Sequence, residues 1–444
     1  MRRSDACAAE GRDVGDPWTG SCDDRSRGSV EEDDLGLNAD SVVPLGDRPL
    51  GANRSFLLLW TGQFVSQIGD RLAMVAFPWL IYQSTGSTFS TGVVLALYAL
   101  PYVVFGVLAG VVIDRLNKRL VLVGVDLLRA GLVLSVPLVA EVSTGGVYLV
   151  SFLTASLGVF YDPCKLAILP DLVPSTQLIR ANSFLATAET LTEVVGYALA
   201  GFIVFAVSTS TAFVIDAATF IFSATAVALM SYRYVRPPAA AFRRPGVVHE
   251  AREGIAYLVH HRGLAANTLL VIAAAIGLGA SYPLTFFYAT DVIGGGARTF
   301  GLLESAIGAG YLVGSLAMAG AGQRVDKGIA MTAGITVLGA GLASIGAIST
   351  LLLAFVPFFI LGVADAAALI SIDTYFQQTV PAQLRGRVWG VRFTLTQGVY
   401  ALSVLAGGAA AGLIDVQVLF VVCGIVVAVP GLAGVFMASV RRAR

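Results

Sequence analysis

Charged residues, histidines and cysteines are all scarce in this sequence. Of its 444 residues, 13% are charged and 56% are hydrophobic, whereas about 25% of an ordinary soluble domain is charged. The three histidines, His249, His260 and His261, lie in one polar stretch, so no apolar segment carries a zinc-protease histidine pair or a histidine proton relay. The sequence also contains no phosphate-binding Gly-x-x-x-x-Gly-Lys-Ser/Thr loop. These absences exclude an ATPase within this chain and argue against an intramembrane metalloenzyme, so we expect no enzyme activity.

The cysteines give no sign of a metal or redox site. They lie far apart, without a Cys-x-x-Cys pair or a neighbouring histidine, at Cys7, Cys22, Cys164 and Cys423. We expect no metal, no cofactor and no nucleic-acid partner for this chain.

Apolar residues, by contrast, fall into long blocks with the charges between them, which is the pattern of an all-α membrane protein. A helix needs about 20 apolar residues, each rising about 1.5 Å, to cross about 30 Å of hydrocarbon. The sequence predicts twelve such transmembrane helices. They occupy residues 56–82, 91–113, 120–141, 146–168, 184–207, 211–231, 264–289, 300–322, 329–349, 352–376, 391–413 and 416–438.

The positive charges are distributed unevenly between the two ends of these spans. With the N-terminus in the cytoplasm, nineteen of the twenty-two lysines and arginines after residue 54 fall on the cytoplasmic side. Arg298 falls outside, and Arg71 and Arg129 lie within spans. Cytoplasmic loops of membrane proteins carry an excess of Lys and Arg. The sequence therefore predicts a multi-pass protein of a bacterial-type inner (plasma) membrane with both termini in the cytoplasm.

The polar N-terminal tail and the longest connection between spans divide the chain into four segments. Residues 1–53 are predicted to be a disordered acidic cytoplasmic tail, because they are highly charged and lack an apolar run. Residues 54–231 and 264–444 are each predicted to form a six-helix bundle. Residues 232–263 are a predicted cytoplasmic linker, in which Val247–His261 has the pattern of a short amphipathic helix.

The two predicted bundles also repeat each other at a shift of about 205–210 residues. The run Leu172–Leu178 after the fourth span resembles Thr379–Leu384 after the tenth. The stretch 110–118 after the second span likewise resembles 320–327 after the eighth. Such a repeat predicts two pseudo-symmetric bundles with a binding site between them, near the middle of the membrane.

The most informative motif lies in the loop after the second span, where one helix must end and another begin within a few residues. It reads Gly-Val-Val-Ile-Asp-Arg-Leu-Asn-Lys-Arg from Gly110 to Arg119. Gly110 permits close helix approach, and Asn117 tolerates the left-handed backbone of a sharp turn. Asp114 can pair with a base or with the positive N-terminal end of a helix. We expect Lys118 and Arg119 to anchor the loop among anionic lipid headgroups.

This loop resembles the signature of the major facilitator superfamily, Gly-x-x-x-Asp-Arg-x-Gly-basic-basic, with Asn117 in place of the second glycine. Other segments are similar to the exporters of enterobactin-type siderophores and macrolides, the transmembrane secretion effectors of that superfamily. These segments are Ser66–Leu72, Pro101, Asp126–Arg129 and Arg385–Val388. The resemblance covers about residues 54–440 and implies a secondary transporter. It also implies a conformational latch made of Gly110, Asp114, Arg115, Asn117, Lys118 and Arg119.

One departure from that family pattern concerns the fifth span. Antiporters of the superfamily often carry Gly-Pro followed by further glycines there, whereas this chain has Tyr197 after Gly196, with Gly201 beyond. The chain therefore has the glycine but not the proline of this drug/proton antiporter motif. The two glycines remain available for close helix packing.

Several charged residues fall inside the predicted spans, where inserting one costs roughly 2.5–3.5 kcal/mol. Asp126 and Arg129, three residues apart, are expected to form a structural ion pair. A carboxyl group kept from water binds protons more readily, so the remaining charges are candidates for proton coupling or for recognising cationic parts of a substrate. The alternative is that the acids form fixed ion pairs. These candidates are Asp70, Arg71, Glu189, Glu193 and Asp365.

Together these features predict a secondary active transporter that exports a small organic molecule in exchange for protons, by alternating access, as a monomer in the lipid bilayer. The expected cargo is a drug, a macrolide or a siderophore-like compound, and the direction is implied by the resemblance. An importer or uniporter of the same fold, or a non-transporting membrane sensor or scaffold, is the alternative. A channel is disfavoured by the six-plus-six repeat.

Overall fold

The computed structural model describes residues 49–113, 116–232, 247–321 and 326–436. These described residues pack as one compact unit. Within the described ranges the secondary structure is helical, without strands. Nearly all of the predicted acidic tail lies outside the described residues.

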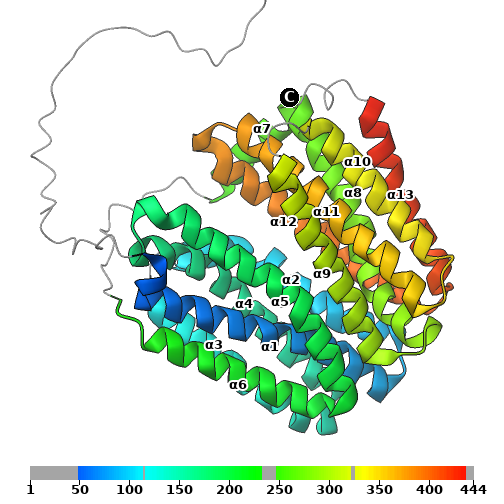
Figure 1. Ribbon diagram of the computed structural model, residues 1–444, viewed down its shortest axis with the longest axis horizontal. Coiled ribbons are helices and arrows are strands. Elements are labelled where there is room, and N and C mark those ends of the chain that lie inside the picture. The colour runs from blue at the N-terminus through cyan, green and yellow to red at the C-terminus, as the bar shows by residue number, and fades with distance from the viewer. Residues whose placement is uncertain (1–48, 114–115, 233–246, 322–325, 437–444) are drawn as a thin grey trace, which may run out of the picture. The chain divides into compact units, whose positions relative to one another are not determined.

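Twelve long helices make up the described part of the chain (Figure 1). They are α1 (Arg54–Thr85), α2 (Thr88–Ile113), α3 (Lys118–Val142), α4 (Thr144–Leu172), α5 (Leu178–Ala206), α6 (Thr209–Ala228), α8 (Arg262–Phe287), α9 (Gly296–Ala321), α10 (Lys327–Ile345), α11 (Leu351–Thr379), α12 (Ala382–Ala410) and α13 (Val416–Phe436). Eleven are long and apolar enough to cross a membrane. The twelfth, α1, has 32 residues and carries Asp70 and Arg71 near its middle.

The prediction of twelve helices is confirmed, while several of their boundaries were wrong. α5 begins at Leu178 rather than 184, and α12 begins at Ala382 rather than 391. Both helices start with polar turns that contain arginines. A hydropathy pattern ends where the hydrocarbon ends, but backbone hydrogen bonding continues into the more polar region beyond it.

Shorter helical segments connect the long ones. The turns η3 (Leu50–Ala52) and η4 (Ser175–Gln177) precede α1 and α5, and a π-helical turn, η6 (Tyr288–Val292), extends α8. The helix α7 (Val247–His260) falls in the linker stretch for which the sequence indicates an amphipathic helix. It packs on the first turns of α12 through an ion pair between Glu253 and Arg387.

The helices pack as two copies of one pattern. α1 packs against α5 and α6, α2 against α4, and α3 against α4 and α6. In the same way α8 packs against α12 and α13, α9 against α11, and α10 against α11 and α13. This correspondence gives two pseudo-symmetric groups of six helices, called here the N-half (α1–α6) and the C-half (α8–α13). The exact residues at which the domains divide remain a prediction.

Two seams join the halves, α5 with α9 and α2 with α12, and each is the counterpart of the other under the repeat. α2 and α12 cross at glycines: a Cβ on Gly92 would lie 2.7 Å from Cα of Gly408. α5 and α9 also meet closely, since a Cβ on Gly201 would lie 2.8 Å from the carbonyl oxygen of Ala297. Small residues at such crossings let the helix backbones touch.

The two ends of the molecule differ. The connections after α2, α4, α9 and α11 lie at the end that carries α7, called here the α7 end, and the connections after α1 and α8 lie at the opposite end. Figure 1 shows the two halves meeting at the opposite end and diverging toward the α7 end. At the opposite end the Tyr82 hydroxyl donates a hydrogen bond to Asp291 at 2.6 Å, linking α1 to the end of α8.

Candidate functional site

Arg71 connects α1 to α5 in the interior of the N-half. Its Nη2 lies 3.3 Å from Oε1 of Glu193, and its guanidinium carbon lies 5.2 Å from the centre of the Tyr197 ring. Gly196 leaves room for this approach, because a Cβ there would lie 2.8 Å from Cγ of Arg71. Both charged side chains are partly exposed. The pair is therefore not sealed off completely inside the N-half, and Glu193 is its more exposed member.

Glu304 faces the same stretch of α5 from the C-half. Gly301 and Gly308 lie one turn to either side of it on α9, and both pack on the α5 backbone: a Cβ at Gly308 would lie 3.2 Å from N of Val194. Residues 301, 304 and 308 share one helical face. The buried Glu304 side chain therefore faces α5 next to Arg71 and Glu193. Three titratable groups from both halves thus gather at the α5–α9 seam.

Glu304 is absent from the candidates predicted from the sequence. It lies close to the start of the predicted span 300–322, whereas α9 begins at Gly296 and places this acid two turns inside the helix. The signal that could have identified it is the pattern of a single acid flanked on one face by glycines, Gly301 and Gly308.

Asp365 and Glu189 occupy different surroundings from the central pair. Asp365 lines a C-half pocket of about 430 Å³ together with Tyr400, Asp373 and Arg392. The last two form an ion pair with an N–O distance of 3.2 Å. Glu189 is exposed, one turn before Glu193 on α5. The structure therefore joins Arg71 and Glu193 directly, and places Asp365 in the C-half pocket.

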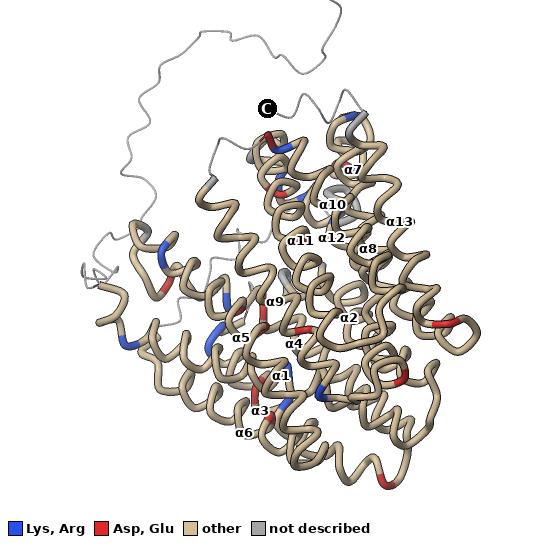
Figure 2. The backbone as a smooth tube through the Cα atoms, turned by 45° about the vertical axis from the view of Figure 1, so that its right-hand side comes forward, with Lys and Arg blue, Asp and Glu red and all other residues tan. Residues whose placement is uncertain are grey.

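Arg129 pairs with Asp70, not with the acid that the sequence spacing favoured. Arg129 and Asp70 form an ion pair between α3 and α1, and the guanidinium carbon lies 4.2 Å from the centre of the Phe220 ring. Asp126 is fully buried, and within the described residues neither of its carboxyl oxygens has a hydrogen-bond partner. The predicted Asp126–Arg129 ion pair is thus corrected, because the long arginine side chain extends across to α1. Figure 2 shows acidic and basic positions, in red and blue, along the backbone near α1 and α3.

Asn117 has a different role from the one the motif suggested. Its backbone has φ −69° and ψ 106°, which is extended rather than left-handed, and its side chain caps α3 by accepting hydrogen bonds from the N–H groups of Arg119 and Leu120. Asparagine is a preferred N-cap because its short side chain reaches these free donors. Gly110 lies in the last turns of α2. Asp114 and Arg115 lie outside the described residues.

Lys118 and Arg119 bind protein groups, and their expected contact with lipid headgroups stays a prediction. Lys118 Nζ lies 2.8 Å from both Oδ2 of Asp171 and the carbonyl oxygen of Ala167 on α4. Arg119 donates to the carbonyl oxygen of Ala228 at the end of α6. The cause is the packing of α3 between α4 and α6, which brings their helix ends together. In the C-half Lys327 repeats the contact, with Nζ 2.7 Å from Oε1 of Gln378.

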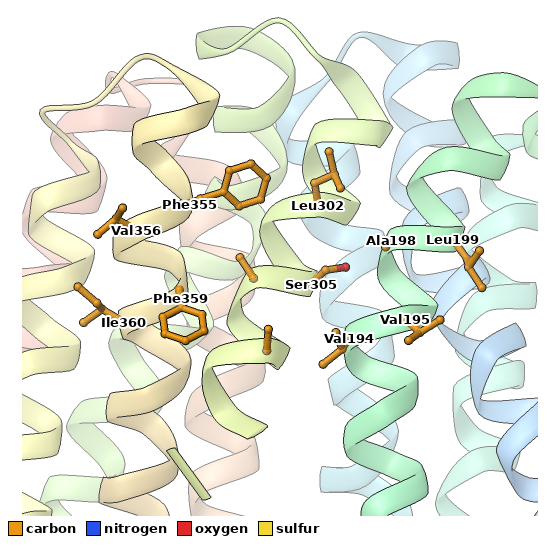
Figure 3. Close-up of a pocket in the computed structure, with 12 residues that line it drawn as sticks. Val194, Val195, Ala198, Leu199, Leu302, Ser305, Phe355, Val356, Phe359 and Ile360 are labelled. Carbon is orange, nitrogen blue, oxygen red and sulfur yellow. The ribbon is translucent and has the colours of Figure 1, made fainter. Parts of the chain in front are cut away.

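An apolar groove of about 800 Å³ runs along the α5–α9 seam (Figure 3). Figure 3 shows side chains of α5, α9 and α11 lining it, among them Val194, Leu302 and Phe359. Ser305 is the one polar residue among those that line it, and it directly follows Glu304. The groove therefore offers a lipophilic surface next to the charges at the seam.

Comparison with known proteins agrees with this architecture. The family model of the Major Facilitator Superfamily matches residues 59–403. The chain is 27% identical to macrolide efflux protein A of Streptococcus pyogenes, over 79% of this chain and 87% of that protein. It is 25% identical to the multidrug efflux pump Tap of Mycolicibacterium fortuitum, over 87% of this chain and 96% of that protein. The crystal structure of the nucleoside transporter NupG matches with a TM-score of 0.69 and 14% identity, covering 86% of this chain and 98% of that chain.

Twelve helices in two repeated halves, with charges gathered where the halves meet, define a multi-pass membrane transporter. The chain belongs to the Major Facilitator Superfamily. Its members carry small molecules across the lipid bilayer and are transporters rather than enzymes.

Proposed function

We propose that this transporter exports a small lipophilic organic molecule, of the drug, macrolide or siderophore-like kind, in exchange for protons and by alternating access. The names of the relatives, a macrolide efflux protein and a multidrug efflux pump, support export of such compounds. The apolar groove beside Ser305 supports a lipophilic cargo. The observation that carries the proposal is the cluster of Arg71, Glu193 and Glu304 at the α5–α9 seam.

In this proposal Arg71 changes partner when a proton binds. Arg71 and Glu193 belong to the N-half, whereas Glu304 belongs to the C-half. The Arg71 guanidinium is attracted to whichever of Glu193 and Glu304 is ionised, so a proton bound by Glu193 or released by Glu304 shifts that attraction across the seam. Proton binding would thereby change the attraction between the halves. One proton that crosses a potential of 100 mV supplies about 2.3 kcal/mol for this change.

Asp70, Glu189 and Asp365 are proposed as further members of the proton or substrate path. Asp70 is partly exposed and already paired with Arg129, so it would exchange protons with water. The alternative remains that these acids are held in fixed ion pairs, with no part in coupling.

Acid-driven uptake into everted membrane vesicles tests the proposal. A screen of cationic drugs, macrolides and siderophores first identifies a cargo, and uptake is then measured across a pH series for Glu193→Gln and Asp70→Asn. We expect both variants to lose uphill accumulation and its pH dependence while keeping downhill exchange. Glu141→Gln, an exposed acid on α3, is the matched control. Unchanged accumulation in both variants would refute the coupling role.

We further propose that the α7 end is cytoplasmic, that the protein resides in a bacterial inner membrane, and that it acts as a monomer. The concentration of lysines and arginines toward that end supports the orientation. Cysteine labelling from either side of intact cells tests it.

The loop at Gly110–Arg119 is proposed as a latch between conformations, with Asp114 as its central acid. An Asp114→Ala variant that transports at the normal rate would argue against this role.

A further inference from the structure

A second group of acids lies buried in the N-half, around Arg129. It comprises Asp70 on α1, Asp126 on α3 and Asp216 on α6, all of which interact electrostatically with that arginine. Asp126 and Asp216 are 0% exposed. Within the described residues, none of their four carboxyl oxygens has a hydrogen-bond partner. Three carboxyl groups therefore share one arginine, which is already paired with Asp70.

Asp216 points directly at α1. A Cβ added to Gly69 would overlap Oδ1 of Asp216 and the Thr219 hydroxyl, so both groups lie against the α1 backbone beside Asp70. The Thr219 hydroxyl donates to the backbone carbonyl of Asp216 at 2.7 Å and also lies beside the Asp216 carboxyl group. The Tyr98 hydroxyl of α2 is near Asp216 and is also unpartnered within the described part of the chain.

Asp126 lies on the other side of Arg129. Its polar neighbours are Arg129, Ser223 on α6 and Tyr161 on α4. The last two lie 3.4 Å apart, oxygen to oxygen. No second cation faces either acid among the interactions that the structure describes for them. A buried carboxylate that must share its one cation with two other acids, and has only hydroxyl groups beside it, is disfavoured, whereas the protonated acid is neutral.

The repeat shows that the fold does not need these charges. Equivalent helices α3 and α10 begin at Lys118 and Lys327, so Ile335 and Leu338 of the C-half correspond to Asp126 and Arg129. In the same way α6 begins at Thr209 and α13 at Val416, so Cys423 of the C-half corresponds to Asp216. All three C-half side chains are buried in the apolar core. The charged group is thus specific to the N-half, which argues for a role other than packing.

We propose that Asp126 and Asp216 are protonated in this conformation and form a proton-binding site that exchanges with water through Asp70. Asp70 is the member that reaches water, with 31% of its side chain exposed. In the exchange, the O–H bond of Asp216 breaks and one forms on Asp70, while Arg129 moves its ion pair from Asp70 to the new Asp216 carboxylate. The total charge of the group is unchanged. Within the described ranges no group of three or more His, Cys, Asp and Glu side chains is placed to hold a metal ion.

This site deepens the proposed proton coupling, but its existence can be tested without any transport. Infrared spectroscopy of the full-length protein in lipid at neutral pH separates the carbonyl band of protonated carboxylic acids from that of carboxylates. We expect Asp126→Asn and Asp216→Asn each to lose the intensity of one protonated carboxyl group, and the exposed Glu141→Gln control to lose none. Asp126→Ile and Asp216→Cys, which copy the C-half residues, are second variants in case an asparagine impairs folding.

Exchange of the band in heavy water tests the route through Asp70. We expect Asp70→Asn to slow the deuterium shift of the Asp126 and Asp216 bands relative to wild type. An unchanged band in both single variants, or displacement of the protons by sodium ions at constant pH, would overturn the site. An intact band in a protein whose uptake is independent of pH would instead refute the proposed proton coupling and leave the site standing.

Discussion

The crossing of α2 and α12 at Gly92 and Gly408 allows a quantitative prediction for Gly92→Ala. The new Cβ would lie 2.7 Å from Cα of Gly408, whereas carbon atoms in contact prefer about 3.5–4.0 Å. The helices must therefore separate by roughly 1 Å, because the obstructing atom is backbone and cannot rotate away. Overpacking of this kind costs about 1–3 kcal/mol, equivalent to a shift of about 5- to 150-fold in an equilibrium between two conformations.

We expect Gly92→Ala to destabilise the conformation described here, in which the halves meet at the opposite end. The populations can be measured by pulsed electron double resonance between spin labels on Val142 and Leu352. Both are exposed at that end, on α3 and α11. The labels require a background without native cysteines, of which Cys164 and Cys423 are buried. Gly92→Ala should raise the population of long distances by several fold or more.

Gly106→Ala is the matched control, because it adds the same methyl group to α2 where nothing lies within 4 Å. Its distance distribution should equal that of the wild type. If Gly92→Ala gives the wild-type distribution and is equally stable, the glycine crossing does not hold the opposite end together and the reasoning fails.

Three further substitutions test other contacts. Tyr82→Phe removes the 2.6 Å hydrogen bond to Asp291, worth about 0.5–1.5 kcal/mol, and should shift the same distance distribution less than Gly92→Ala does; an equal or larger shift would contradict this ranking. Gly339→Leu forces a side chain to within 2.6 Å of the Gly424 carbonyl oxygen and should destabilise the α10–α13 packing by about 1–3 kcal/mol or more, seen as a lower midpoint of thermal unfolding in detergent. Glu253→Gln removes the ion pair with Arg387, worth about 0–1 kcal/mol, and should speed hydrogen exchange in α7 alone.

The helices could be predicted from the sequence because hydrocarbon thickness imposes length and polarity on every span. Even α1, whose polar middle keeps it out of the apolar set, was found from the length and position of its apolar flanks. The helix ends could not be predicted equally well. α5 and α12 begin with arginine-containing turns, where backbone hydrogen bonds rather than hydropathy decide where the helix starts.

The ion pairs were less predictable than the helices, since a sequence does not give the rotation of one helix against another. Spacing along α3 favoured Asp126 as the partner of Arg129, but the rotation of α1 brings Asp70 into reach instead. Glu193 was a candidate from its depth alone, and its contact with Arg71 depends on the close packing at Gly196. Asn117 illustrates the same limit, because its helix-capping role follows from its backbone angles.

The two seams are counterparts in the repeat, yet they carry different chemistry. At the α2–α12 seam the closest contact is between the backbones of Gly92 and Gly408, which depends on shape and is indifferent to protonation. At the α5–α9 seam the contact zone includes Glu193 and Glu304, whose interaction depends on how many protons they hold. Because relative motion of the halves must change both seams together, a proton bound at one seam would, in the proposed mechanism, bias the whole molecule. The α5–α9 seam would then respond to protonation, while the α2–α12 seam responds to shape alone.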